Sequence, residues 1–112
     1  MLRPSGLKDV PVNPTTLSAA VEGGVVKVGV KCCTLHRTDS SSLDVWEYDP
    51  GEFEWRVDVE YSACVISGRA AVDLADGRLL SLLPGDALYL PAGMHSRWIV
   101  HETLRTVAAR GS

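Results

Sequence analysis

Short runs of alternating apolar and polar residues, separated by turn residues, cover most of the chain. From Val26 to Cys32, valines alternate with small or polar residues, which predicts a half-buried strand over 25–32. Further strands are predicted over 43–48, 52–57, 61–67, 69–75, 78–83, 86–90 and 96–107. No stretch keeps the helical period of about 3.6 residues with caps at its ends. The pattern therefore predicts an all-β sandwich, barrel or jelly roll.

Turn signals divide these strands and set the limits of the domain. Asp76-Gly77 predicts a two-residue hairpin, and Pro84-Gly85 predicts a tight turn. Pro91 has no N–H for a strand ladder, so it ends the apolar run before it. A serine-rich loop is predicted over 38–42. Residues 1–20 hold three prolines and predict an extended N-terminal arm, which leaves 21–110 as a single domain.

Composition and charge exclude several classes of function. Charged residues make up 22% of the 112 residues, and the net charge of −3 comes with no basic run. Nucleic-acid binding is therefore not expected. No apolar segment approaches the roughly 18–20 residues that span a bilayer, so no membrane partner is expected either. The start of the chain leads into no apolar secretory core, which predicts a cytoplasmic protein.

The three cysteines predict no disulfide framework. Cys32 and Cys33 are adjacent, Cys64 is left over, and neighbouring cysteines can be bridged only through a strained ring. Reduced, buried thiols are the main expectation. The alternative is a metal or redox group of Cys32, Cys33 and His36, which lacks a second ligand pair at zinc spacing.

The run from Gly85 to Gly93 resembles a known family motif. Its spacing, Gly-x5-Pro-x-Gly, is that of the second motif of the cupins, and the segment from Pro50-Gly51 to Gly68 resembles their first motif. The resemblance spans roughly residues 43–107. It is closest to small single-domain cupins such as ureidoglycine aminohydrolase and the ethanolamine-utilisation cupin. It implies a double-stranded β-helix, which is a jelly-roll barrel, for the predicted cupin domain 21–110.

The metal ligands of the cupin motifs are missing from this sequence. The resemblance places the family's two neighbouring histidine ligands near Trp55 and Val57, its glutamate ligand at Tyr61 and its third histidine ligand at Ser96. These side chains cannot make a tight divalent site, so no cofactor is expected. The alternative is an atypical metal site at Glu60 and His95, each one residue away from a ligand position. A one-residue shift turns a strand side chain to the other face, so this site needs a β-bulge or loop slack.

The barrel interior is predicted to be aromatic, with a few polar anchors. If Tyr61 and Ser96 face inward, the alternation brings Trp98 inward as well, and Trp55 and Val57 line the same mouth. Asp44, by contrast, is predicted to face solvent. The candidate ligand-binding residues are Trp46, Tyr48, Trp55, Val57, Tyr61, His95, Ser96 and Trp98. The alternative is that these side chains only fill the barrel.

Three functions remain open at this point, and no catalytic residue is assigned. The first is a metal-free cupin that binds a small organic molecule in its aromatic barrel. The second is a small cupin enzyme with an atypical divalent metal, acting on a nitrogenous or acidic metabolite. The third is a structural or interaction module with a filled barrel. A homodimer is expected, formed through sheet edges or by the N-terminal arm adding a strand to a partner.

Overall fold

The chain folds into strands and turns alone. A computed structural model describes residues 10–14 and 29–111. The strands are β1 (Asn13–Pro14), β2 (Val30–Arg37), β3 (Ser41–Tyr48), β4 (Gly51–Arg56), β5 (Glu60–Leu74), β6 (Leu79–Leu82), β7 (Ala87–Leu90) and β8 (His95–Gly111). These residues form no helix, and so none that could cross a membrane. The predicted all-β class is confirmed.

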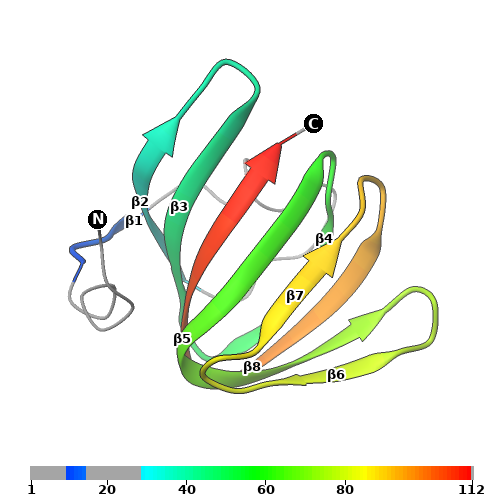
Figure 1. Cartoon of the computed structure of the whole chain (residues 1–112). Coiled ribbons are helices and arrows are strands. Elements are labelled where there is room, and N and C mark those ends of the chain that lie inside the picture. The colour runs from blue at the N-terminus through cyan, green and yellow to red at the C-terminus, as the bar shows by residue number, and fades with distance from the viewer. Residues whose placement is uncertain (1–9, 15–28, 112) are drawn as a thin grey trace.

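Two long strands, β5 and β8, belong to both halves of the fold (Figure 1). β8 has 17 residues and pairs with β3 along its C-terminal half and with β4 along its N-terminal half. β5 has 15 residues, pairs with β8 over its length, and adds β7 near its start and β6 near its end. All pairings are antiparallel. The sheet therefore rolls into two facing halves, β1-β2-β3-β8-β5-β7 and β4-β8-β5-β6, which is the predicted jelly roll.

The bend in β5 lies where the sequence suggested a break between two strands. Its pairing with β8 shifts register three times between Val65 and Ala70, and such irregularities bend a strand. Gly68 sits within this bend at φ 92°. A Cβ atom at Gly68 would overlap the backbone carbonyl oxygen of Thr103 on β8. The predicted strands 61–67 and 69–75 are therefore one continuous strand that changes direction at a glycine.

Other predicted boundaries agree to within a few residues, with two corrections. The strand predicted over 25–32 is β2, Val30–Arg37, and residues 25–28 lie outside the described part of the chain. The loop predicted over 38–42 is shorter because β3 already begins at Ser41. The turns at 76–77, 84–85 and 91–93 are present, each with its glycine at positive φ. The Asp86 carboxylate accepts a hydrogen bond from the Leu83 N–H at 2.8 Å and so closes the second turn.

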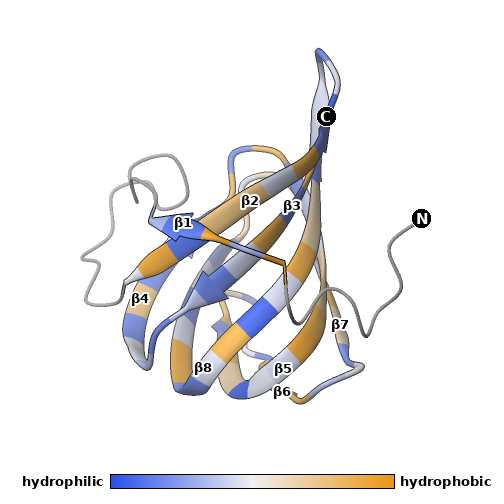
Figure 2. Cartoon of the chain, turned by 90° about the vertical axis from the view of Figure 1, so that its left-hand side faces the viewer, coloured by the Kyte–Doolittle hydropathy of each residue, from blue (hydrophilic) through white to orange (hydrophobic). Residues whose placement is uncertain are grey.

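Residues 10–14, the described part of the predicted N-terminal arm, pack against this chain's own domain. Asn13 and Pro14 pair with Cys32 and Lys31 of β2, so β1 extends the sheet by a short strand (Figure 2). The Val10 carbonyl oxygen accepts a hydrogen bond from Nη1 of Arg105 at 2.8 Å. The division into an arm 1–20 and a domain 21–110 stays a prediction.

The core lies between the two halves of the sheet. Buried and exposed positions alternate along much of β5 and β8, and the buried set faces inward. Figure 2 shows hydrophobic and hydrophilic bands along these strands. The largest side chains without measurable exposure include Trp98, Leu90 and Leu104. Such burial of aromatic and branched side chains is the main stabilising contribution in a domain of this size.

The bend at Gly68 generates a stability prediction. Replacing Gly68 with alanine is expected to lower the free energy of unfolding by about 2–5 kcal/mol, because it adds an overlap with backbone to the left-handed strain. Gly77→Ala is the matched control: its φ is 91°, but nothing lies within 4 Å of the new Cβ. It is expected to cost only about 1–2 kcal/mol. Urea unfolding measures both, and equal losses would contradict a close approach at Gly68.

Candidate functional site

The four positions that correspond to the cupin metal ligands come together inside the barrel. Trp55, Val57, Tyr61 and Ser96 are all at most 5% exposed, as the alternation predicted. Trp55 lies directly across from Ser96 on β8, and its ring meets the Tyr61 ring edge-on at 4.5 Å between centroids. The place where related motifs carry ligands is thus occupied here by an aromatic pair.

The Ser96 hydroxyl makes two hydrogen bonds within the protein. It donates to the Trp55 carbonyl oxygen at 3.1 Å and accepts from Nε1 of Trp98 at 3.0 Å. These bonds fix the Trp98 indole between β4 and β8. Ser96 therefore acts as an internal brace in this structure, rather than as the free polar anchor that the sequence suggested.

Glu60 and His95 are placed outside this interior. Both side chains are exposed, and both strands keep regular register where they begin. The register shifts of β5 occur beyond Val65, too late to turn Glu60 inward. Within residues 10–14 and 29–111, no three His, Cys, Asp or Glu side chains are close enough to hold a metal ion. The described residues do not fit the metal site of the cupin motif.

The cysteines are free, and each is half-buried rather than fully buried. Cys32 and Cys33 are consecutive in β2, so their side chains point to opposite faces and do not form one group with His36. Burial first, and then the nearby Asp44 carboxylate, raise the pKa of the Cys32 thiol to about 11. Cys32 is therefore a neutral thiol at physiological pH.

Six aromatic rings form a continuous layer through the interior. Trp46 and Tyr48 share the inward face of β3 and stack at 6.2 Å between centroids. Tyr48 in turn contacts Phe53 at 5.5 Å and Trp98 at 5.9 Å. Trp98 contacts Trp55 at 6.1 Å, which links this group to the pair with Tyr61. All candidate residues except His95 and Ser96 therefore belong to one buried cluster, and Ser96 is joined to it by its hydrogen bonds.

Three buried polar atoms in this interior have no hydrogen-bond partner: Trp46 Nε1, Tyr61 Oη and Thr106 Oγ1. Thr106 lies directly across from Trp46, on β8. Burial raises the pKa of Tyr61 to about 12, and the neighbouring hydroxyls of Tyr48 and Thr106 partly oppose this, although neither meets the Tyr61 oxygen in hydrogen-bond geometry. Unpartnered buried polar groups are rare and cost free energy, so these three atoms make this part of the interior the candidate site.

Asp44 also faces this interior, and the prediction that it faces solvent is wrong. Its residue is 3% exposed, and its carboxylate accepts hydrogen bonds from Thr34 Oγ1 at 2.6 Å and Ser42 Oγ at 2.8 Å. The reason is alternation: Asp44 is two residues before Trp46 on β3, and Trp46 is buried. This end of the barrel therefore carries a buried carboxylate.

Asp44 and Thr106 are the polar residues that sequence reasoning missed. The alternation of side chains along the strands could have identified both residues. If Trp46 faces inward, then Asp44, two residues before it on β3, must face inward as well. If Ser96 and Trp98 face inward, then the even-numbered positions of β8 do so too, and these include Thr106. The exposed Glu102 interrupts that series, because β8 passes the β5 bend there. The sequence does not show whether the same alternation continues beyond Glu102.

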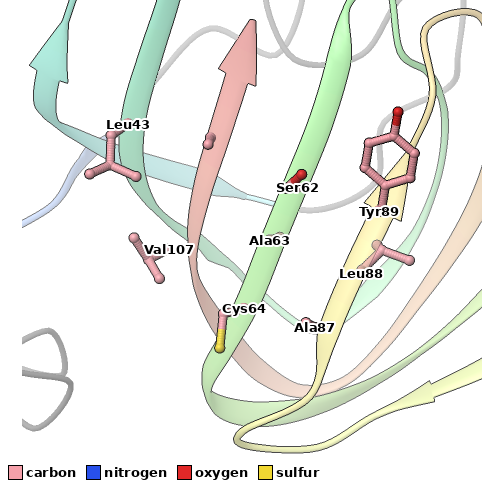
Figure 3. A pocket seen from close by; sticks show the side chains of 9 residues that line it. Leu43, Ser62, Ala63, Cys64, Ala87, Leu88, Tyr89 and Val107 are labelled. Carbon is pink, nitrogen blue, oxygen red and sulfur yellow. The ribbon is translucent and has the colours of Figure 1, made fainter.

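A second feature is an apolar groove of about 450 Å³ on the outside of the barrel. Figure 3 shows side chains from β3, β8, β5 and β7 spread across it. Its lining residues are Leu43, Ser62, Ala63, Cys64, Ala87, Leu88, Tyr89, Val107 and Ala109, and none is charged. Tyr89 is 53% exposed and Leu43 38% exposed, so large apolar side chains meet solvent here.

The fold and the two motif segments identify the family. A family model described as an EutQ-like cupin domain matches residues 35–107. The chain therefore belongs to the EutQ-like cupin family, and the predicted small single-domain cupin is confirmed. The comparison with curated proteins found no match.

Solved structures agree with the fold. The EutQ protein of Clostridium difficile superposes with a TM-score of 0.73 at 20% identity, covering 94% of this chain and 82% of that one. KdgF from Halomonas sp. gives 0.68 at 15% identity, covering 94% and 91%. A DUF861 family protein from Thermotoga maritima is 30% identical over 57% of this chain and 73% of its own, with a TM-score of 0.54. At these identities the first two show the fold alone.

The buried tyrosines generate a prediction at alkaline pH. Burial holds the pKa of Tyr48 well above its ordinary value and raises the pKa of Tyr61 from 10.0 to about 12. Because the fold favours the neutral phenols, stability is unaffected below pH 10 and falls as the pH rises from 10 towards 12. Phenolate absorbance and thermal unfolding against pH measure this. Tyr61→Phe is expected to reduce the loss, and simultaneous titration of all three tyrosines near pH 10 in a folded chain would contradict it.

Proposed function

We propose that this cupin binds a small organic molecule inside its aromatic barrel, without a resident metal ion. One observation carries the proposal: Trp46, Tyr61 and Thr106 each hold a buried polar atom without a partner. Leaving such a group unpaired costs about 1–3 kcal/mol. A ligand that offers an oxygen to the indole N–H and a donor or acceptor to the two hydroxyls would remove that cost.

The surrounding side chains suit such a ligand. The rings of Trp46, Tyr48 and Trp55 offer apolar contact next to the polar atoms, and binding sites commonly combine apolar walls with a few placed polar groups. Val57, Ser96 and Trp98 are proposed to hold the rings in position. His95 lies outside this arrangement, so its contribution would be at the barrel rim.

The metal-free part of the proposal rests on the ligand positions themselves. Trp55, Val57, Tyr61 and Ser96 supply no imidazole or carboxylate, and Glu60 and His95 point outward. An enzyme with an atypical metal is therefore less well supported than a binding protein. The three free cysteines fit a reducing compartment, which supports the proposed cytoplasmic location.

The binding proposal predicts that a single substitution can remove ligand binding without lowering the stability of the free protein. A panel of small heterocyclic and polar metabolites is screened by tryptophan fluorescence and by the shift in melting temperature that ligand linkage produces. Thr106→Val removes one unpartnered hydroxyl without changing shape. It is expected to leave the free protein as stable or more stable, because a polar group has become apolar, and to abolish the ligand response.

Thr103→Val, on the exposed side of β8, is the matched control and should keep the response. A panel without any hit, together with a stabilised Thr106→Val chain, would support the filled barrel instead. Elemental analysis of the same purified protein is expected to show less than one metal ion per chain. One tightly held ion, lost on Glu60→Ala or His95→Ala, would contradict the metal-free site.

We also propose that two copies of the chain form a homodimer through the outer groove of β3, β8, β5 and β7. The lining is uncharged, whereas the outer face of β4, β8 and β6 carries the exposed ion pair of Arg97 with Glu52. Copies of a chain with net charge −3 repel each other least where they meet through an uncharged face. A two-fold axis would bury each groove against its counterpart.

Ser62→Arg tests the dimer, because Ser62 is exposed within the groove. Sedimentation is expected to show a dimer for the unmodified chain and a monomer for Ser62→Arg, since a buried arginine without a partner opposes association. Ser81→Arg, on the exposed side of β6, is expected to remain a dimer. An unmodified chain that stays monomeric at high concentration would refute the interface.

A further inference from the structure

Asp44 is a buried carboxylate whose only described partners are two hydroxyl groups. None of the ion pairs of the described residues includes Asp44. These pairs are Arg78 with Asp76, Arg97 with Glu52, Arg105 with Glu47 and Arg110 with Asp58. A carboxylate has about four lone-pair sites, so two hydroxyl donors leave part of its capacity unused. Buried carboxylates are ordinarily compensated by a cation, because burial without one is costly.

The inward surface next to Asp44 is made of small side chains. Ala108 lies directly across from Asp44 on β8, and Ala63 lies directly across from Ala108 on β5. Both are buried, and each contributes only a methyl group. On the same strands, one inward position away from these alanines, stand Thr106 and Tyr61, which carry two of the three unpartnered polar atoms. A carboxylate, two alanines and unpartnered donors thus share one patch of the inner face.

Charged groups surround this patch. The Asp44 carboxylate raises the pKa of both the Cys32 thiol and the Tyr61 phenol, after the larger contribution from burial. Arg110 lowers both of these pKa values, and Arg37 also lowers that of Cys32. The Arg110 side chain is 22% exposed, and its guanidinium pairs with Asp58, at 3.3 Å between Nη2 and Oδ1. The described ion pair of Arg110 is therefore with Asp58 and not with Asp44.

A polar groove of about 250 Å³ lies at the turn between β2 and β3. Arg37, Ser42 and Arg110 form part of its wall, and Asp39 also lines it. Ser42 Oγ donates to the Asp44 carboxylate, so one side chain both lines the groove and contacts Asp44.

We propose that the ligand of the barrel is a small organic cation whose protonated amino group binds the Asp44 carboxylate. This inference rests on the proposed binding function and names the ligand's chemical class. An ammonium group supplies a direct ion-pair partner for the carboxylate and up to three N–H donors. The rings of Trp46 and Tyr48 add favourable contact with a cation. An oxygen atom of the same ligand would accept from Trp46 Nε1.

The test compares three probes of similar shape: benzylamine, benzyl alcohol and benzoate. Benzylamine is expected to bind most tightly to the full chain, as measured by calorimetry and by the melting temperature. Asp44→Asn keeps the shape of the side chain but removes the charge. Its amide oxygen can accept from one of the two hydroxyls of Thr34 and Ser42, and its NH2 group can donate to the oxygen of the other. It is expected to weaken benzylamine binding by about tenfold or more and to leave binding of benzyl alcohol unchanged.

Asp39→Asn is the matched control, because it removes one negative charge from the same groove at an exposed position. It should leave benzylamine binding within about twofold, since screening by water and salt weakens an exposed charge. A second measurement uses the unmodified chain in case Asp44→Asn does not fold. Bound benzylamine is expected to slow alkylation of Cys32 relative to Cys33, since only Cys32 faces Asp44.

The outcomes separate this inference from the function on which it rests. Equal binding of all three probes, with no effect of Asp44→Asn but loss with Thr106→Val, would overturn amine recognition and leave the binding site in place. Binding of no probe, with unprotected Cys32, would overturn the amine inference. If the metabolite panel also gives no response, the proposed function fails with it.

Discussion

The close approach of β5 to β8 at Gly68 is the constraint on which the rest of the structure depends. At this point β5 bends along β8, and each of these two long strands therefore belongs to both halves of the sheet. The absence of a side chain lets the β5 backbone pass against the Thr103 carbonyl. Without this bend, β4 and β6 could not close over the rings carried by β3. The bend therefore creates an interior, and the residues that face it determine the chemistry.

Much of the fold and part of the site could be predicted from the sequence, because turns and alternation are local. The glycine turns and the inward faces of Trp55, Tyr61 and Ser96 followed from spacing and parity. The continuity of β5 could not be predicted, because a glycine that bends a strand looks the same in sequence as one that ends it. The charge of Asp44 favours solvent, but its face is decided by the alternation that it shares with the buried Trp46 on β3. Hydrogen-bond partners could not be predicted, since Ser96 and Thr106 differ only in what distant strands bring to them.

That difference divides the polar groups of the interior into two sets. The Ser96 hydroxyl makes its described hydrogen bonds to the Trp55 carbonyl and the Trp98 indole, which fixes the Trp98 ring. The Thr106 hydroxyl, the Tyr61 phenol and the Trp46 indole N–H have no hydrogen-bond partner, and the Asp44 carboxylate on the same inner face forms no ion pair among the described residues. Of the four motif ligand positions, Trp55, Val57 and Ser96 therefore serve packing, whereas Tyr61 belongs to the unpartnered set.

A competing partner for this unpartnered set is water, and the energetics show how water and a ligand differ. One buried water makes about three hydrogen bonds, so a single molecule could serve Trp46, Tyr61 and Thr106 together. Water supplies no charge, however, and Asp44 would still be compensated only by Thr34 and Ser42. A ligand that merely repeats the water's bonds gains little by displacing it. One that also brings a cation to Asp44 gains an interaction that water cannot supply, which is why charge, rather than size or aromatic character, should decide what this barrel selects.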